Sequence, residues 1–200
     1  MVHRSLTCGI INHHRERRRR DHQHNHHNHQ KHHQVNMILT EDSITDDLYQ
    51  KCVKELDKKV SKDCWKSSSV TWASAVQQGV VGSCIFTPVS DRIQKLLEQE
   101  LKPSLPKYRE LEFNYYIWQL HSGISWHNDS APNRLFGATL YLGMEWHPDN
   151  GGWFIWEEDD GYHTILPKKK LLVVNDNYEH HCVTPVAIDF RCTIQIWGNA

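Results

Sequence analysis

The sequence lacks long apolar runs, closely paired cysteines and an apolar leader, and each absence excludes a class of protein. No run approaches the roughly 18 apolar residues that a membrane-spanning helix needs, so we expect no membrane span. The apolar stretch at residues 8–11 is far shorter than the core of a secretory signal. The six cysteines show no CxxC spacing, and without a secretory signal we expect reduced thiols in a cytoplasmic protein.

Apolar residues are also scarce in the first 36 positions, whose charge differs from that of the rest of the chain. This segment holds seven of the 23 Lys and Arg residues, two of the 24 acidic residues and ten of the 16 His residues. The remainder therefore has 16 basic and 22 acidic residues, a net charge of −6. Such a composition buries too little apolar surface to fold, so we predict a disordered, dispensable extension at 1–36. Metal binding by its histidines or nucleic-acid binding by its arginines is the alternative.

The rest of the chain, 37–200, suits one folded domain, mainly β with flanking helices. Apolar residues recur at helical spacing over about 45–60 and 90–101, and Pro103 ends the second helix. From residue 111 on, short segments rich in aromatic and β-branched residues alternate with turn signals, which indicates a sandwich or barrel. The expected strands are 112–120, 125–129, 135–142, 153–157, 162–166, 171–174, 180–186 and 191–197.

The last predicted strand has one polar and one apolar side, because alternate residues of a strand point in opposite directions. The polar side carries Arg191, Thr193, Gln195 and Trp197. The apolar side carries Cys192, Ile194 and Ile196. A barrel whose interior holds a polar ligand would explain this pattern.

Candidate metal ligands occur in Ser125–Asp129 and far downstream. His127 and Asp129 are two residues apart, so on a strand both side chains point to one side. A second histidine, His181, lies on a later predicted strand, and Arg191 begins the last one. Two histidines and a carboxylate with open positions are the ligands of non-haem Fe(II) oxygenases. A His-x-Asp alone is a weak signal, since it often arises by chance.

Here four features follow in order over about residues 110–198: the His-x-Asp, Tyr141-Leu142, Gly151-Gly152, and His181 with Arg191. This combination resembles the prolyl-4-hydroxylase-like branch of the 2-oxoglutarate- and Fe(II)-dependent oxygenases. The resemblance implies a double-stranded β-helix (jelly-roll) core, with Fe(II), 2-oxoglutarate and O2 as cofactors and ascorbate as a further candidate. The iron ligands would be His127, Asp129 and His181. The contacts to 2-oxoglutarate would come from Arg191, Tyr141 and Thr193.

The resemblance also covers a co-substrate contact, the substrate entrance and the direction of His180, and at one position the chain departs from it. Relatives often carry a tyrosine three residues before the glycine of the strand turn, and this chain has Leu120 there. We therefore expect Trp118 or Tyr116 to supply the further co-substrate contact. Trp153 and Trp156 follow the glycine pair, where relatives line the substrate entrance, and we expect one of them to contact substrate. His180 should point away from the side that His181 faces.

The expected function is hydroxylation of an aliphatic carbon, with a peptidyl proline as the first candidate and a small molecule as the second. An AlkB-like nucleic-acid demethylase is disfavoured, because the segment after Arg191 lacks the second arginine expected there and the folded part is acidic. A cupin-like module that binds metal without turnover needs no buried cation, so Arg191 argues against it. The sequence does not indicate an oligomeric state.

Overall fold

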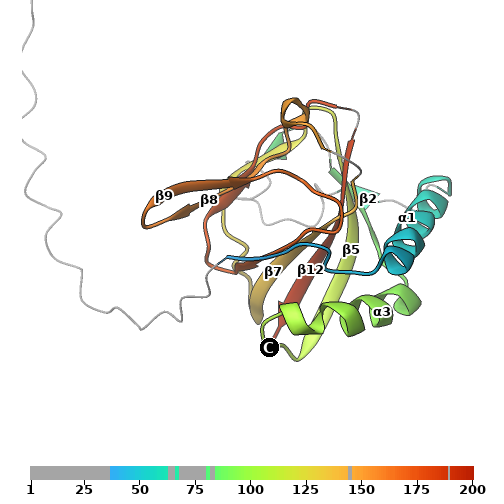
Figure 1. Cartoon of the computed structure of the whole chain (residues 1–200). Helices are drawn as coiled ribbons and strands as arrows, with labels where there is room; N and C mark the ends of the chain where they lie inside the picture. Colours follow the sequence, from blue (N-terminus) through green and yellow to red (C-terminus); the bar gives the residue numbers. More distant parts are fainter. Residues whose placement is uncertain (1–36, 63–65, 68–79, 82–83, 144–145, 189) are drawn as a thin grey trace, which may run out of the picture. The chain divides into compact units, whose positions relative to one another are not determined.

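The computed structural model describes residues 37–62, 66–67, 80–81, 84–143, 146–188 and 190–200 (Figure 1). The predicted extension at 1–36 lies outside these residues. The described elements are β1 (Ile38–Thr40), α1 (Asp46–Val60), β2 (Lys66–Ser67), β3 (Val80–Val81), β4 (Cys84–Pro88), α3 (Asp91–Leu101), η2 (Lys102–Ser104), β5 (Glu110–Gln119), β6 (Gly123–His127), β7 (Arg134–Tyr141), η3 (Pro148–Asn150), β8 (Phe154–Glu158), β9 (Gly161–Ile165), β10 (Leu172–Asp176), β11 (His181–Val183) and β12 (Phe190–Asn199).

The strands form two antiparallel sheets, which are the layers of the predicted jelly roll. The major sheet has seven described strands in the order β1-β10-β7-β12-β5-β4-β2. The minor sheet has five, in the order β3-β6-β11-β8-β9. Neighbours in these orders are mostly distant in sequence, so the fold is held by long-range strand pairing.

Both predicted helices form, and they cover the outer face of the major sheet (Figure 1). Thr45 caps α1 by accepting a hydrogen bond from the backbone N–H of Leu48, and acidic residues occupy the first turn while lysines occupy the last. The apolar stripe of each helix packs against residues of β5, β7 and β12 in one core cluster. Burying a leucine such as Leu97 contributes about 1.5–3 kcal/mol, so this packing fixes the outer face of the sheet.

The predicted sidedness of the last strand is confirmed. Ile194 and Ile196 of β12 are fully buried against the helices. The polar side of β12 faces the other way and lines a cavity between the two sheets, through Arg191, Thr193, Gln195 and Trp197.

The strand predicted at 125–129 is wrong at both ends. β6 runs from Gly123 to His127, and Asp129 follows it in a loop. The strand ends there because the Asn128 side chain accepts a hydrogen bond from the backbone N–H of Ser130, which forms an Asx turn. Strand alternation therefore does not bring His127 and Asp129 together.

Four described strands, β1, β2, β3 and β4, were not predicted from the sequence. Of these, β4 matters most, because it pairs with β5 and extends the major sheet beside the cavity. None of the described helices is long and apolar enough to cross a membrane.

Candidate metal centre

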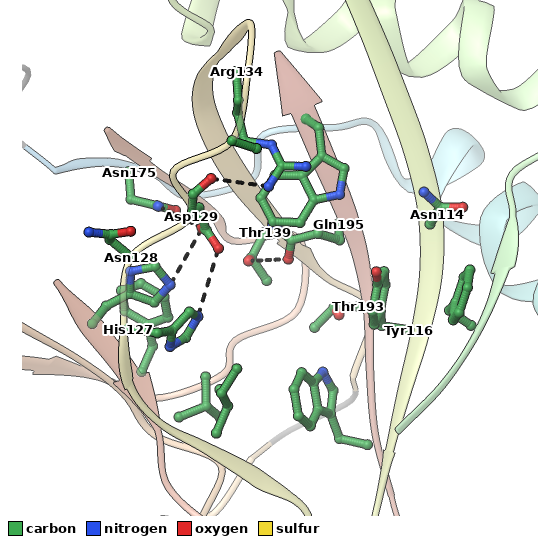
Figure 2. Close-up of a pocket in the computed structure, with 18 of the residues that line it drawn as sticks. Asn114, Tyr116, His127, Asn128, Asp129, Arg134, Thr139, Asn175, Thr193 and Gln195 are labelled. Atoms are coloured by element: carbon green, nitrogen blue, oxygen red, sulfur yellow. Dashed lines mark hydrogen bonds and ion pairs between the residues drawn. The ribbon is translucent and has the colours of Figure 1, made fainter. Parts of the chain in front are cut away.

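Two histidines and one carboxylate meet at the inner face of the minor sheet (Figure 2). His127 ends β6 and His181 begins β11, and the two are direct partners across the antiparallel pair. Asp129 reaches them from the loop after β6, with Oδ1 3.7 Å from His127 Nε2 and Oδ2 3.5 Å from His181 Nε2. The ligand atoms all lie within 4.8 Å of one another. Two metal–ligand bonds of about 2.1 Å place their donor atoms roughly 3 Å apart at a right angle, so the 3.5 and 3.7 Å distances from Asp129 to the two imidazoles are close to what one metal ion needs.

A β-bulge aims His127 into the cavity. Ile124 pairs with Val183 and His127 pairs with His181, so three residue steps on β6 face two on β11. The extra residue reverses the alternation, and both Ile124 and His127 line the cavity although they are three apart.

Both imidazoles are held by backbone carbonyls. His127 Nδ1 lies 2.8 Å from the Ser125 oxygen, and His181 Nδ1 lies 2.9 Å from the Glu179 oxygen. Because a carbonyl only accepts, each Nδ1 carries the proton and each Nε2 keeps a lone pair for a metal. Burial and the neighbouring His181 ring lower the pKa of His127, which favours the neutral form that binds metal.

The Asp129 loop is fixed by two side chains that the sequence did not point to. Asn175 Nδ2 donates to Asp129 Oδ2 at 3.0 Å, and Arg134 Nη1 donates to the Asp129 backbone oxygen at 3.1 Å. Asn175 lies on β10, and Arg134 begins β7. A polar residue directly after the apolar run 171–174 was the available signal for Asn175.

The cavity beside the cluster has a volume of about 460 Å³. Arg191 lines it from β12, only 2% exposed. Its Nη2 donates to the Tyr141 hydroxyl at 3.2 Å, while its Nε has no hydrogen-bond partner. No described carboxylate lies within 4.0 Å of the guanidinium, so this buried cation lacks a counter-ion within the described residues. A buried charge is costly unless it is paired, so the site fits an anionic group.

The stretch that carries these residues matches one family model. Residues 111–199 match the 2OG-Fe(II) oxygenase superfamily. Over these residues the chain is similar to that superfamily, which uses Fe(II), 2-oxoglutarate and O2. The donor set of the cluster and Arg191, which has no counter-ion among the described residues, fit these cofactors. No relative was found among curated protein sequences.

Solved structures show the same fold at low identity. A Pseudomonas putida prolyl-4-hydroxylase is 18% identical with a TM-score of 0.65, and the match covers 82% of this chain and 92% of that one. A Trichoplax adhaerens prolyl hydroxylase, in complex with a hypoxia-inducible-factor peptide, is 13% identical with a TM-score of 0.68 over 82% and 83%. A viral collagen prolyl hydroxylase from Paramecium bursaria Chlorella virus 1, in complex with 2-oxoglutarate, is 13% identical with a TM-score of 0.56 over 80% and 94%.

Some of the remaining candidate residues line the cavity and others do not. Thr193 lines the cavity on the same side of β12 as Arg191, whereas Tyr141 is fully buried behind Arg191, its ring centre 4.9 Å from the guanidinium carbon. Trp118 and Tyr116 both line the cavity, while Leu120 is exposed and does not.

Neither Trp153 nor Trp156 lines the cavity. The Trp153 indole N–H donates to the Pro148 oxygen, and the Trp156 indole N–H donates to Glu158. The tryptophan that does line it, besides Trp118, is Trp197 of β12. The sequence placed Trp197 on the inner side of its strand but did not assign it a function.

His180 is exposed, and its Nε2 lies 3.2 Å from Asn128 Nδ2. His181 is 4% exposed and faces the other two ligand candidates. His180, which directly precedes β11, thus points away from the other two ligand candidates, as the alternation predicted.

Proposed function

We propose that the domain is a 2-oxoglutarate- and Fe(II)-dependent dioxygenase that hydroxylates an aliphatic C–H bond, with iron held by His127, Asp129 and His181. The observation that carries this proposal is the buried, unpaired Arg191 in the same cavity as the three ligand candidates. A module that only binds metal has no use for such a cation. An oxygenase has one, because 2-oxoglutarate carries a second carboxylate.

Each side chain has a distinct role in this proposal. The two histidines present neutral Nε2 atoms and Asp129 presents a carboxylate oxygen, which leaves three coordination positions for ligands. The Arg191 fork pairs with the far carboxylate of 2-oxoglutarate, the Tyr141 hydroxyl holds that fork in place, and Thr193 adds a hydroxyl donor. With iron bound, 2-oxoglutarate is oxidised to succinate and CO2 while one oxygen atom of O2 enters the substrate C–H bond.

A peptidyl proline is the substrate that we propose first. The similar structures include prolyl hydroxylases, one of them holding a peptide. In this chain the Arg134 guanidinium carbon lies 3.8 Å from the centre of the Trp197 ring, and both residues line the cavity. A flat indole suits the face of a pyrrolidine ring, and the Arg134 Nε, which has no partner, suits a peptide carbonyl.

The test supplies the protein with Fe(II), O2 and 2-oxoglutarate and, in separate reactions, with a library of proline-containing peptides, a panel of small molecules or a methylated oligonucleotide. Succinate is quantified, and peptides are examined for the added mass of one oxygen atom. His127→Ala serves as the inactive control. Succinate without peptide modification, but with modification of a small molecule, would reject the proline assignment and keep the dioxygenase. Metal binding without any succinate would reject the dioxygenase and support the cupin-like module, and demethylation of a methylated oligonucleotide would support the AlkB-like alternative.

A further inference from the structure

We propose that Asn175 and Gly137 are positioning residues of the metal centre, which together hold the Asp129 carboxylate in place as a ligand. The inference rests on the proposed function only in taking His127, Asp129 and His181 as the ligands. Two independent observations at the same carboxylate oxygen support it: a hydrogen bond from Asn175 and the space left by Gly137.

The first contact is a hydrogen bond from the major sheet. Asn175 is 1% exposed, and its Nδ2 donates both to Asp129 Oδ2 at 3.0 Å and to the Asp176 backbone oxygen at 3.3 Å. The second bond fixes the plane of the amide, so the first has a set direction. Asp129 itself lies on a loop, where strand pairing does not restrain it. Asn175 therefore restrains the one ligand candidate that the minor sheet does not.

The second observation is the space beside Asp129 that glycine leaves at position 137. Asn175, Gly137 and Trp197 form a row across β10, β7 and β12, with Gly137 in the middle (Figure 2 shows Asn175 beside Asp129). A Cβ at Gly137 would lie 2.8 Å from Asp129 Oδ2, 3.0 Å from the Trp197 ring and 3.3 Å from Asn175 Nδ2. Its backbone is not among the described positive-φ positions, so glycine serves here for space and not for conformation. The carboxylate fills the slot that the missing side chain leaves.

Holding Oδ2 in this way fixes the orientation of the whole carboxylate toward the two histidines. Oδ1 lies 3.7 Å from His127 Nε2 and Oδ2 lies 3.5 Å from His181 Nε2, so both distances depend on the Asn175 amide and on the space at Gly137.

The experiment compares two variants with two matched controls. Asn175→Ala removes the amide that holds Asp129, and Asn177→Ala removes another buried amide, whose Nδ2 donates to the Arg134 backbone oxygen. Gly137→Ala fills the slot, and Gly143→Ala adds a methyl group where the nearest atom would be 3.6 Å away. Co(II) affinity is measured by calorimetry, the Co(II) d–d spectrum reports coordination, and thermal unfolding of the metal-free proteins reports structure.

Loss of an outer partner of a metal ligand typically costs 10- to 100-fold in metal affinity. We therefore expect Asn175→Ala and Gly137→Ala to bind Co(II) about 10- to 100-fold more weakly, with an altered d–d spectrum, while both controls keep wild-type affinity and spectrum. Wild-type Co(II) affinity and spectrum in a folded Asn175→Ala protein would overturn the proposal. If Asn175→Ala does not fold, wild-type affinity and spectrum in Gly137→Ala would overturn it instead. His127→Ala separates failure of this positioning proposal from failure of the proposed function. If His127→Ala binds Co(II) like the wild type, the ligand set of the proposed function is wrong.

Discussion

Replacing Arg191 tests the proposed co-substrate site without touching the metal ligands. The guanidinium is almost fully buried and has no described carboxylate within 4.0 Å. A bidentate, charge-assisted pair in such a cavity is worth about 2–4 kcal/mol, from the energies of hydrogen bonds to charged groups. At 1.4 kcal/mol per decade this is roughly 30- to 1000-fold in affinity. Arg191→Ala should therefore bind Fe(II) normally and 2-oxoglutarate far more weakly.

Arg191→Lys should recover only part of the loss, because an ammonium offers a point charge without a fork. The assay is an anaerobic titration of the Fe(II)-loaded protein with 2-oxoglutarate, followed through the iron–ligand charge-transfer band. Arg92→Ala, which removes an exposed arginine from α3, is the matched control. Unchanged 2-oxoglutarate affinity in Arg191→Ala would refute the co-substrate role and return the cupin-like module to first place.

Three further predictions need only simple measurements. His181→Ala should lose Fe(II) binding in a calorimetric titration while His180→Ala keeps it, and the reverse result would mean that the assigned register is off by one residue. A protein beginning at Met37 should melt at the temperature of the full chain and bind Fe(II) equally well; a lower melting temperature or insoluble expression would contradict a dispensable extension. Burial raises the pKa of Cys52 and Cys192 to about 12, so among the described cysteines the partly buried Cys182 should be alkylated first at neutral pH, as peptide mapping would show.

Local patterns in the sequence were enough to predict the elements and their sides. Helical spacing of apolar residues predicted the bounds of α1 and α3 within a residue or two. Strand alternation predicted the inner side of β12 and the outward direction of His180. These features depend on residues a few positions apart, whose relation is visible in one segment of chain.

Contacts between distant segments were not predictable in this way. Asn175 and Asp129 are 46 residues apart, and Gly137 matters only because β7 runs between β10 and β12. No periodicity within β10 indicates that its last polar residue will face a carboxylate from another loop. For the same reason, the sequence did not indicate that Trp197 lines the cavity while Trp153 and Trp156 do not, because the cavity is built from strand order and not from chain position.

The grouping of the three ligand candidates depends on departures from regular strand geometry. If β6 alternated strictly, Ile124 and His127 would point to opposite faces, and His127 could not meet His181 while Ile124 packed inside. The bulge between them removes this conflict, and the Asx turn after His127 then brings Asp129 back toward both rings. The sheet thus fixes two ligands by cross-strand pairing, and the third is placed by a turn and restrained by Asn175. A centre built this way should tolerate changes on the outer faces of both sheets far better than an inserted or deleted residue between Ile124 and Asp129, because such a change shifts the aim of two ligands at once.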